Sequence, residues 1–289
     1  LFVNVKKLGV FTFTDVMSRD ELETFACRVE QLGYSRIWYP EAFSYESFCL
    51  GGYLLNCTKT IGVASGIANI YARDASASAM GYVSLNKLYQ GRFTLGLGVS
   101  HAPFVEQRGH TYGSPVKEMS DYIKNMKLTF ESLEYKGERN IFVAALGPKM
   151  TALASAEVAG VFPYNITTAQ VELSRKSMGS TGLICCEQKI CLTNDKNKAR
   201  EIARINLEFY LSLPNYQNNW LRLGFDRSDF ENGGSDRFLD SMVISGDRIE
   251  IKDKLNEYFE RGADELVIQP LKANGDPGPD LNALEKIIQ

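Results

Sequence analysis

The sequence lacks several patterns that mark particular classes of protein. Its six cysteines form no C-x-x-C pair and no cysteine–histidine spacing typical of a zinc site. Most of these cysteines stand among apolar neighbours, so we expect buried, reduced thiols rather than a disulfide framework. We therefore predict neither a metal site nor a disulfide-stabilised fold.

Concentrated positive charge is also missing. The formal net charge is −3, and no cluster of lysine and arginine stands out, which argues against nucleic acid and membrane surfaces as partners. No apolar run approaches the roughly 20 residues of a membrane-spanning helix. The first residues, LFVNVKKLGVF, place the lysines after the apolar residues, the reverse of a secretory signal. We therefore expect a cytoplasmic protein that binds a small-molecule substrate, with no nucleic acid and no membrane.

What the chain does contain is a regular alternation of strand-like and helix-like segments. The strand-like segments are residues 7–13, 35–39, 60–67, 93–98, 141–145, 160–164, 182–192 and 265–269. Each is followed by at least one helical pattern, which implies parallel strands joined by right-handed crossovers. Eight such units predict an α/β fold of the TIM (β/α)8 barrel type, formed by residues 1–289 as one domain. An open doubly wound sheet is the alternative, but no G-x-G-x-x-G follows the first strand.

One segment interrupts this alternation. Residues 214–235 are rich in turn residues and asparagine, which predicts an inserted excursion after the seventh strand. A helix is expected to resume at residues 236–244, and another at residues 247–261.

In a β/α barrel, the chemistry lies in the loops after the strands. The fourth strand ends in Val99, Ser100 and His101, and the loop holds both histidines of the chain. An unperturbed imidazole has a pKa near 7, so His101 suits proton transfer, although a strand-end histidine is often purely structural. After the second strand, Glu41 is a carboxylate among apolar and aromatic residues. The alternative for Glu41 is a structural salt bridge to a barrel arginine.

The turn after the fifth strand runs from small residues directly into a helix. A helix amino terminus with free amides and small side chains binds anions, and Lys149 adds a cation. The alternative is an ordinary tight turn between a strand and a helix.

Together these segments resemble a known family. WYPEAF (38–43), ASGIANIYARD (64–74), GRFTLGLGVSHAPF (91–104) and AALGPKM (144–150) occur in this order, followed by SLPNYQNNWLRLGF (212–225) and GGSDR (233–237). The set is similar to the luciferase-like monooxygenase superfamily, and within it to the coenzyme F420-dependent oxidoreductases. The resemblance covers essentially the whole chain and depends on the order and spacing of the motifs.

The resemblance implies a barrel that binds FMN or the deazaflavin coenzyme F420 at the carboxyl ends of the strands. Family members have a bulged third strand with a non-proline cis peptide under the ring, and the matching positions are Ala64 and Ser65, with Gly66 next. In the family, the turn after strand five binds the phosphate of the cofactor. Pro163 matches a position beside the ring or the ribityl chain of the cofactor. The expected cofactor-binding residues are thus Ala64, Ser65, Gly66, Val99, Ser100, Ala145, Leu146, Gly147, Pro148, Lys149 and Pro163.

The sequence departs from this family at the catalytic positions. Sugar-phosphate and alcohol dehydrogenases of the superfamily carry an Asp-His pair after strand two and a glutamate after strand four. Here the matching residues are Glu41-Ala42 and His101. The departure argues against sugar-phosphate oxidation and leaves Glu41 and His101 as the candidate catalytic pair.

We therefore predict a flavin- or deazaflavin-dependent oxidoreductase, working by hydride transfer or monooxygenation on a small organic substrate. Coenzyme F420 is preferred over FMN. Related barrels use the excursion to cover the mouth or to contact a second subunit, so a homodimer is expected. A cofactor-binding barrel without turnover is the main alternative. An aldolase would need a lysine at a strand end, and none stands out.

Overall fold

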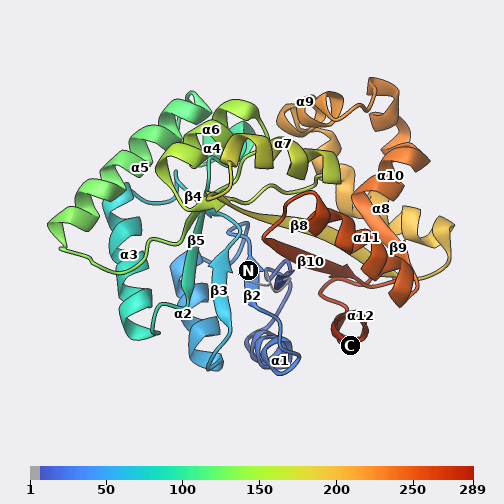
Figure 1. The fold of residues 1–289 in the computed structure, drawn as a ribbon, viewed down its shortest axis with the longest axis horizontal. Coiled ribbons are helices and arrows are strands. Elements are labelled where there is room, and N and C mark those ends of the chain that lie inside the picture. The colour runs from blue at the N-terminus through green and yellow to red at the C-terminus, as the bar shows by residue number, and fades with distance from the viewer. Residues whose placement is uncertain (1–6) are drawn as a thin grey trace.

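The structure is a computed structural model that describes residues 7–289. The barrel strands are β1 (Lys7–Phe11), β2 (Arg36–Tyr39), β3 (Gly62–Ser65), β5 (Phe93–Gly98), β6 (Ile141–Val143), β7 (Gly160–Val161), β8 (Leu183–Leu192) and β10 (Glu265–Leu271). They pair in parallel in this order, and β10 closes the ring by pairing with both β8 and β1 (Figure 1). The closed ring confirms the predicted barrel and excludes the open doubly wound sheet. Each of the eight predicted strands overlaps one of these.

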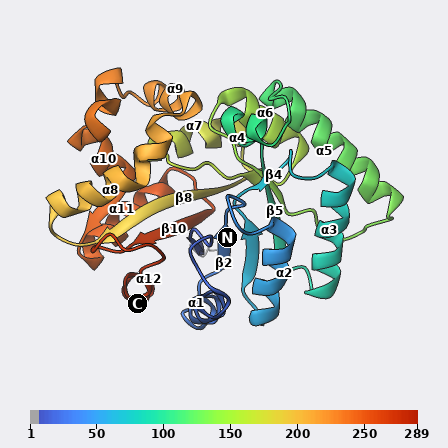
Figure 2. The same cartoon turned by 180° about the vertical axis from the view of Figure 1, so that it is seen from behind.

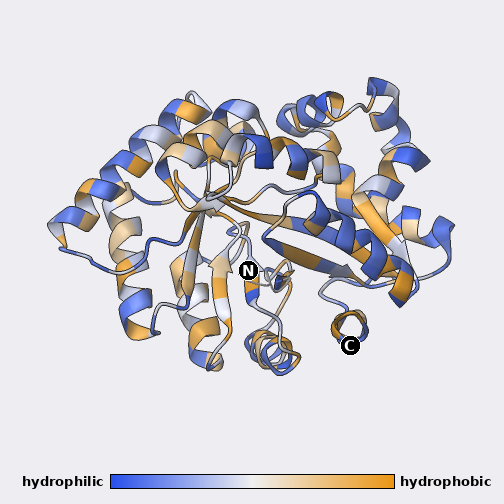
Figure 3. Ribbon diagram, viewed as in Figure 1, coloured by the Kyte–Doolittle hydropathy of each residue, from blue (hydrophilic) through white to orange (hydrophobic). Residues whose placement is uncertain are grey.

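Helices surround the ring. They are α1 (Arg19–Gln31), α2 (Ser47–Cys57), α3 (Ala75–Leu88), α4 (Ala102–Gln107), α5 (Pro115–Ser132), α6 (Pro148–Glu157), α7 (Thr168–Met178), α8 (Lys196–Leu211), α11 (Arg248–Glu260) and α12 (Leu281–Ile288). Most carry both hydrophobic and hydrophilic residues (Figure 3). In α5 the apolar residues recur at helical spacing, and Met119, Ile123, Met126 and Phe130 are buried. α1 begins at a capping box formed by Ser18 and Glu21.

The barrel interior is packed rather than hollow. The ring of Trp38 stacks on that of Phe162, with centroids 4.2 Å apart, and Phe142 meets Trp38 edge-on. Below them, Glu265 accepts hydrogen bonds from Trp38 Nε1 at 3.0 Å and from Arg36 at 2.9 Å. This plug of aromatic side chains confines any ligand to the carboxyl ends of the strands.

The predicted bulge in the third strand is present. β3 pairs with β5 through Val63 and Phe93, whereas β4 (Ala68–Asn69) pairs with β5 through Ala68 and Leu97. The five steps from residue 63 to 68 thus face only four from 93 to 97, which leaves one extra residue in the bulge. The cis peptide joins Gly66 and Ile67. Our placement of this bond at Ala64 and Ser65 was wrong by two residues, because the strand continues in regular pairing through Ser65 before it bulges.

The segment after α8 is more regular than the sequence predicted. Residues 214–235 contain α9 (Pro214–Arg222) and the 3-10 helix η1 (Arg227–Gly233). The helix expected at residues 236–244 is α10 (Asp236–Met242), and the strand β9 (Val243–Gly246) then pairs with β8. Residues 189–191 pair with β9 on one edge of β8 and with β10 on the other. α8, α9 and α10 lie together at one side of the barrel (Figure 2).

Trp220 and Phe225 of this segment are buried within the chain itself. They pack with Phe238 of α10 in a second hydrophobic cluster, outside the barrel. The excursion that carries them was expected to cover the mouth or to contact a second subunit. Instead they anchor α9 to its own chain, because the turn-rich sequence hides an amphipathic helix with a buried face.

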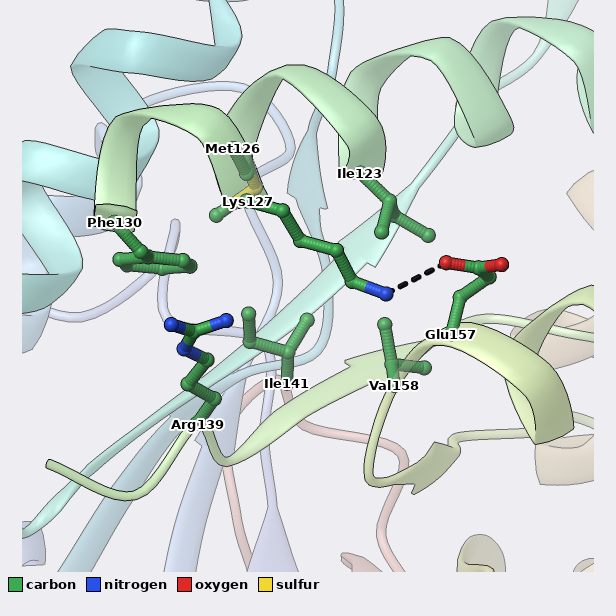
Figure 4. Close-up of a pocket in the computed structure, with 8 residues that line it drawn as sticks. All are labelled: Ile123, Met126, Lys127, Phe130, Arg139, Ile141, Glu157 and Val158. Atoms are coloured by element: carbon green, nitrogen blue, oxygen red, sulfur yellow. Dashed lines mark hydrogen bonds and ion pairs between the residues drawn. The ribbon is translucent and has the colours of Figure 1, made fainter. Parts of the chain in front are cut away.

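Two further features belong to residues 7–289 as a whole. No helix there is long and apolar enough to cross a membrane. A small cavity of about 30 Å³ lies between α5 and β6, and the ion pair of Lys127 and Glu157 spans it at 2.6 Å (Figure 4). It has room for about one water molecule, so it is a packing gap rather than a ligand site. The cytoplasmic prediction used the first eleven residues of the sequence. Residues 1–6 of that segment lie outside the described residues.

The bulge generates a test of the fold. A Cβ atom at Gly96 would lie 2.2 Å from the carbonyl oxygen of Ser65, a backbone atom that has nowhere to move. We expect Gly96→Ala to lower the free energy of unfolding by about 2 kcal/mol or more, as overpacking does. The control is Gly52→Ala in α2, where the new Cβ makes an ordinary contact at 3.4 Å. Urea denaturation measures both; equal stability of the two variants would contradict this account of the bulge.

Candidate active site

A cavity of about 1350 Å³ opens at the carboxyl ends of the strands. Ten of the predicted site residues line it: Glu41, Gly66, Val99, Ser100, His101, Ala145, Leu146, Gly147, Pro148 and Lys149. Ala64, Ser65 and Pro163 do not line it. Ala64 and Ser65 are fully buried in β3, and Phe162 and Tyr164 reach the cavity on either side of Pro163. The structure thus brings most of the predicted residues around one space, although their roles stay predictions.

His101 stands at the start of α4, directly after β5. Ser100 has a positive φ of 56°, and this turn directs the chain from the strand into α4. The imidazole ring lies among Phe104, Phe209 and Tyr216, with centroids 6.0 to 6.3 Å away. Burial lowers the pKa of His101 from its usual value of 6.5. At neutral pH the imidazole is therefore uncharged.

The carboxylate of Glu41 is engaged by its own chain. It accepts backbone hydrogen bonds from Ser47 at 3.2 Å and Asn69 at 2.8 Å, and it pairs with Arg73. Arg73 also contacts Glu46 at 2.8 Å. The salt bridge to an arginine, which was the structural alternative to a catalytic role for Glu41, is therefore present. In this arrangement Glu41 ties the loop after β2 to the segment after β4, and a catalytic role for it stays a prediction.

The turn before α6 is open to an anion. Gly147 precedes the helix and no side chain caps its first turn, while Pro148 has no N–H to leave unpaired. A Cβ at Gly147 would meet only Arg222 Nη2, at 3.8 Å. Arg222 donates to Asn219 at 2.8 Å, which holds its guanidinium beside this turn. Lys149 and Arg222 thus flank amides that suit a phosphate.

Two groups of residues were missed in the sequence. α8 and α9 supply a wall of the cavity through Phe209, Tyr210, Tyr216 and Arg222, which no local motif marks. Beneath it, Lys189 Nζ lies 3.1 Å from Glu187 and 4.1 Å from the ring centroid of Tyr164. Burial lowers the pKa of Lys189 and raises that of Glu187. The sequence did contain a sign of this pair. Two charged residues stand two positions apart in the otherwise apolar strand ICCEQKICL, so their side chains point to the same side of the sheet.

The ion pair of Glu41 and Arg73 generates a stability prediction. Both side chains are largely buried, so Arg73→Met leaves a buried carboxylate without its partner. We expect a loss of about 3 kcal/mol in the free energy of unfolding, and a smaller loss when Glu41→Gln is added. Lys127→Met, which breaks an exposed pair, is the control and should cost less than about 1 kcal/mol. Thermal and urea unfolding measure all three; a loss that grows in the double variant would refute the pairing.

Comparison with known proteins places the chain in a family. The model of the family described as luciferase-like monooxygenase matches residues 7–265. A 5,10-methylenetetrahydromethanopterin reductase of Archaeoglobus fulgidus is 23% identical, over 95% of each chain. The structure resembles an F420-dependent secondary alcohol dehydrogenase, with a TM-score of 0.76, 17% identity and coverage of 98% of this chain and 96% of that one.

An FMN complex of the oxygenating constituent of 3,6-diketocamphane monooxygenase from Pseudomonas putida is also similar. Its TM-score is 0.73 at 13% identity, over 98% of this chain and 96% of that one. At these identities the structural likeness shows the fold, and the family model shows membership. The chain belongs to the luciferase-like monooxygenase family.

Proposed function

We propose that the protein is an oxidoreductase that uses coenzyme F420 or FMN, by hydride transfer or monooxygenation, on a small organic substrate. One observation carries this proposal: the uncapped turn before α6 and His101 line the same cavity. Family membership supports it. So do proteins of similar structure, which include F420-dependent enzymes and a monooxygenase in complex with FMN.

The residues present fit such a cofactor. A tricyclic ring with a phosphorylated side chain needs a roomy, mostly apolar pocket and an anion site at one end. The cavity offers the bulge at Gly66, aromatic residues at its floor, and the α6 turn with Lys149 and Arg222. Ser100 and Val99 would border the ring. When bound, either cofactor gives or accepts a hydride, and a flavin also reacts with dioxygen.

His101 is the residue we propose to move the proton. Its uncharged imidazole accepts the hydroxyl proton of a substrate as the carbon loses its hydride, and returns the proton in the reverse direction. Glu41 is held by Arg73 and two amides, so it contributes by fixing the loop after β2, whose Phe43 contacts Phe104. This geometry favours His101 over Glu41 as the acid–base group.

Between the two cofactors, we retain the preference for F420. Its acidic tail would need cations beyond the phosphate, and Arg73 stands in the segment after β4. Arg73 is instead occupied by Glu41 and Glu46. Lys149 and Arg222 both line the cavity and are available to the anionic groups of either cofactor.

Two finer points remain proposals. We propose a cytoplasmic protein, supported by six cysteines that are all free thiols in the structure. We also propose a homodimer. Since Trp220 and Phe225 are buried in their own chain, the subunit contact would have to use other residues.

The α6 turn generates a binding prediction. Gly147→Asp places a carboxylate where the phosphate is expected, so we expect the affinity for both FMN and F420 to fall at least about tenfold. Titration of the purified protein at low and high salt measures this. Asn125→Asp, an exposed position of α5 that does not line the cavity, adds the same charge and serves as the control. Unchanged affinity in folded Gly147→Asp would remove this turn from the proposal, and tight FMN binding without F420 binding would reverse the cofactor preference.

His101 generates a prediction on turnover. His101→Ala should lose about 10²- to 10⁴-fold in rate at similar cofactor affinity. In the wild type, alcohol oxidation should slow as the pH falls through the lowered pKa, below 6.5, because protonated His101 cannot accept a proton. The variant should lack this acid limb. The assay screens secondary alcohols, aldehydes and ketones with each cofactor. Cofactor binding without any turnover would favour the non-catalytic alternative.

A further inference from the structure

Three aromatic side chains form a row in the wall of the cavity beside His101. Phe43 follows β2, Phe104 lies on α4 and Phe209 on α8. The ring centroids of Phe43 and Phe104 are 5.7 Å apart, and those of Phe104 and Phe209 are 5.4 Å apart. All three line the cavity. We call them the aromatic row.

The aromatic row is unusually open to solvent for apolar residues. Phe43 is 77% exposed and Phe209 42%, and the neighbouring Ile205 is 67% exposed and also lines the cavity. The position of Phe43 is nevertheless fixed, because Asp15 accepts hydrogen bonds from the backbone of Phe43 at 3.0 Å and Ser44 at 2.6 Å. Contiguous exposed apolar side chains in a concave wall are typical of a ligand site.

The charges of the cavity are distributed unevenly. Lys149 and Arg222 flank the α6 turn. The charge of Glu41 is compensated by Arg73. The polar group in ring contact with the aromatic row is His101, whose imidazole is uncharged at neutral pH. Arg108, at the end of α4, also lines the cavity. The groups in direct ring contact with the row are nevertheless uncharged, which favours an uncharged part of a ligand beside it.

We propose that the aromatic row and His101 form the substrate subsite, and that it binds a neutral, largely apolar small molecule with one carbonyl or hydroxyl oxygen. The apolar part packs against Phe104 and Phe209, and the oxygen hydrogen-bonds to the imidazole of His101. Phe43 covers the outer end. This inference rests on the proposed function, since it names the substrate class of the same cavity.

The test uses a neutral fluorescent probe, N-phenyl-1-naphthylamine, with the full chain in the absence of cofactor. We expect one probe per chain, displaced by cyclohexanone or benzaldehyde and not by glucose 6-phosphate. Phe104→Ala and Phe209→Ala should each weaken probe binding at least about tenfold, whereas Phe104→Leu and Phe209→Leu should retain part of it. Ile249→Ala, at another exposed apolar residue, lies on α11 outside the cavity lining; it is the control and should leave binding unchanged.

Three results would overturn the inference. They are probe binding unaffected by both alanine variants, displacement by glucose 6-phosphate as effective as by the ketone, and a monomer–dimer equilibrium that Phe43→Ser abolishes. The last would show that a second copy covers the row. Cofactor titration of the same variants separates the two proposals. If the cofactor binds but the alanine variants leave probe affinity unchanged, the proposed substrate subsite is wrong and the proposed function stands. If the probe binds the row and no cofactor binds, the proposed function fails.

Discussion

The contact between β3 and β5 at Gly96 is the constraint on which the candidate site depends. The hydroxyl of Ser65 donates to the Gly96 carbonyl at 2.9 Å and accepts from its N–H at 3.0 Å, so the side chain of one strand bonds the backbone of the next. This approach leaves no space for a Cβ at Gly96. The regular pairing ends at Ser65 and the chain bulges at Gly66 and Ile67 into the cavity. The shape of the pocket is thus set by a backbone contact one layer below it.

Above this layer, charge is used to position loops as well as to bind ligands. Arg73 neutralises Glu41 and also reaches Glu46, which caps α2. The same arginine therefore fixes the loop that carries Phe43 and the start of α2. The cations at the α6 turn have no such task, since Lys149 is exposed and Arg222 bonds only neutral oxygens in its surroundings. The charges that hold the loops are paired, whereas the cations at the α6 turn have no acidic partner among the ion pairs of the described residues.

The sequence was sufficient for the barrel because its information is periodic and local. Eight apolar runs, helical spacing as in α5 and the capping box at Ser18 each report on a few neighbouring residues. The site was only partly accessible in this way. The strand-end residues His101 and Gly147 follow directly from the strands before them, whereas Phe209 and Arg222 reach the cavity by the packing of α8 and α9. The cis peptide was misplaced because a bulge is decided by pairing with β5, which a single strand does not display.

The sequence resemblance implies a carboxylate after strand four where this chain has His101, and the surroundings of His101 bear on what that position can do. A carboxylate buried beside Phe104, Phe209 and Tyr216 would face a large desolvation cost, and its pKa would rise until it held a proton. An imidazole avoids this cost by being uncharged near neutral pH, and the same burial lowers its pKa further. It can then donate or accept one hydrogen bond without a compensating cation. The aromatic surroundings and the histidine are therefore mutually consistent: apolar walls are tolerable beside His101 because its resting state carries no charge, and they would not be beside a glutamate.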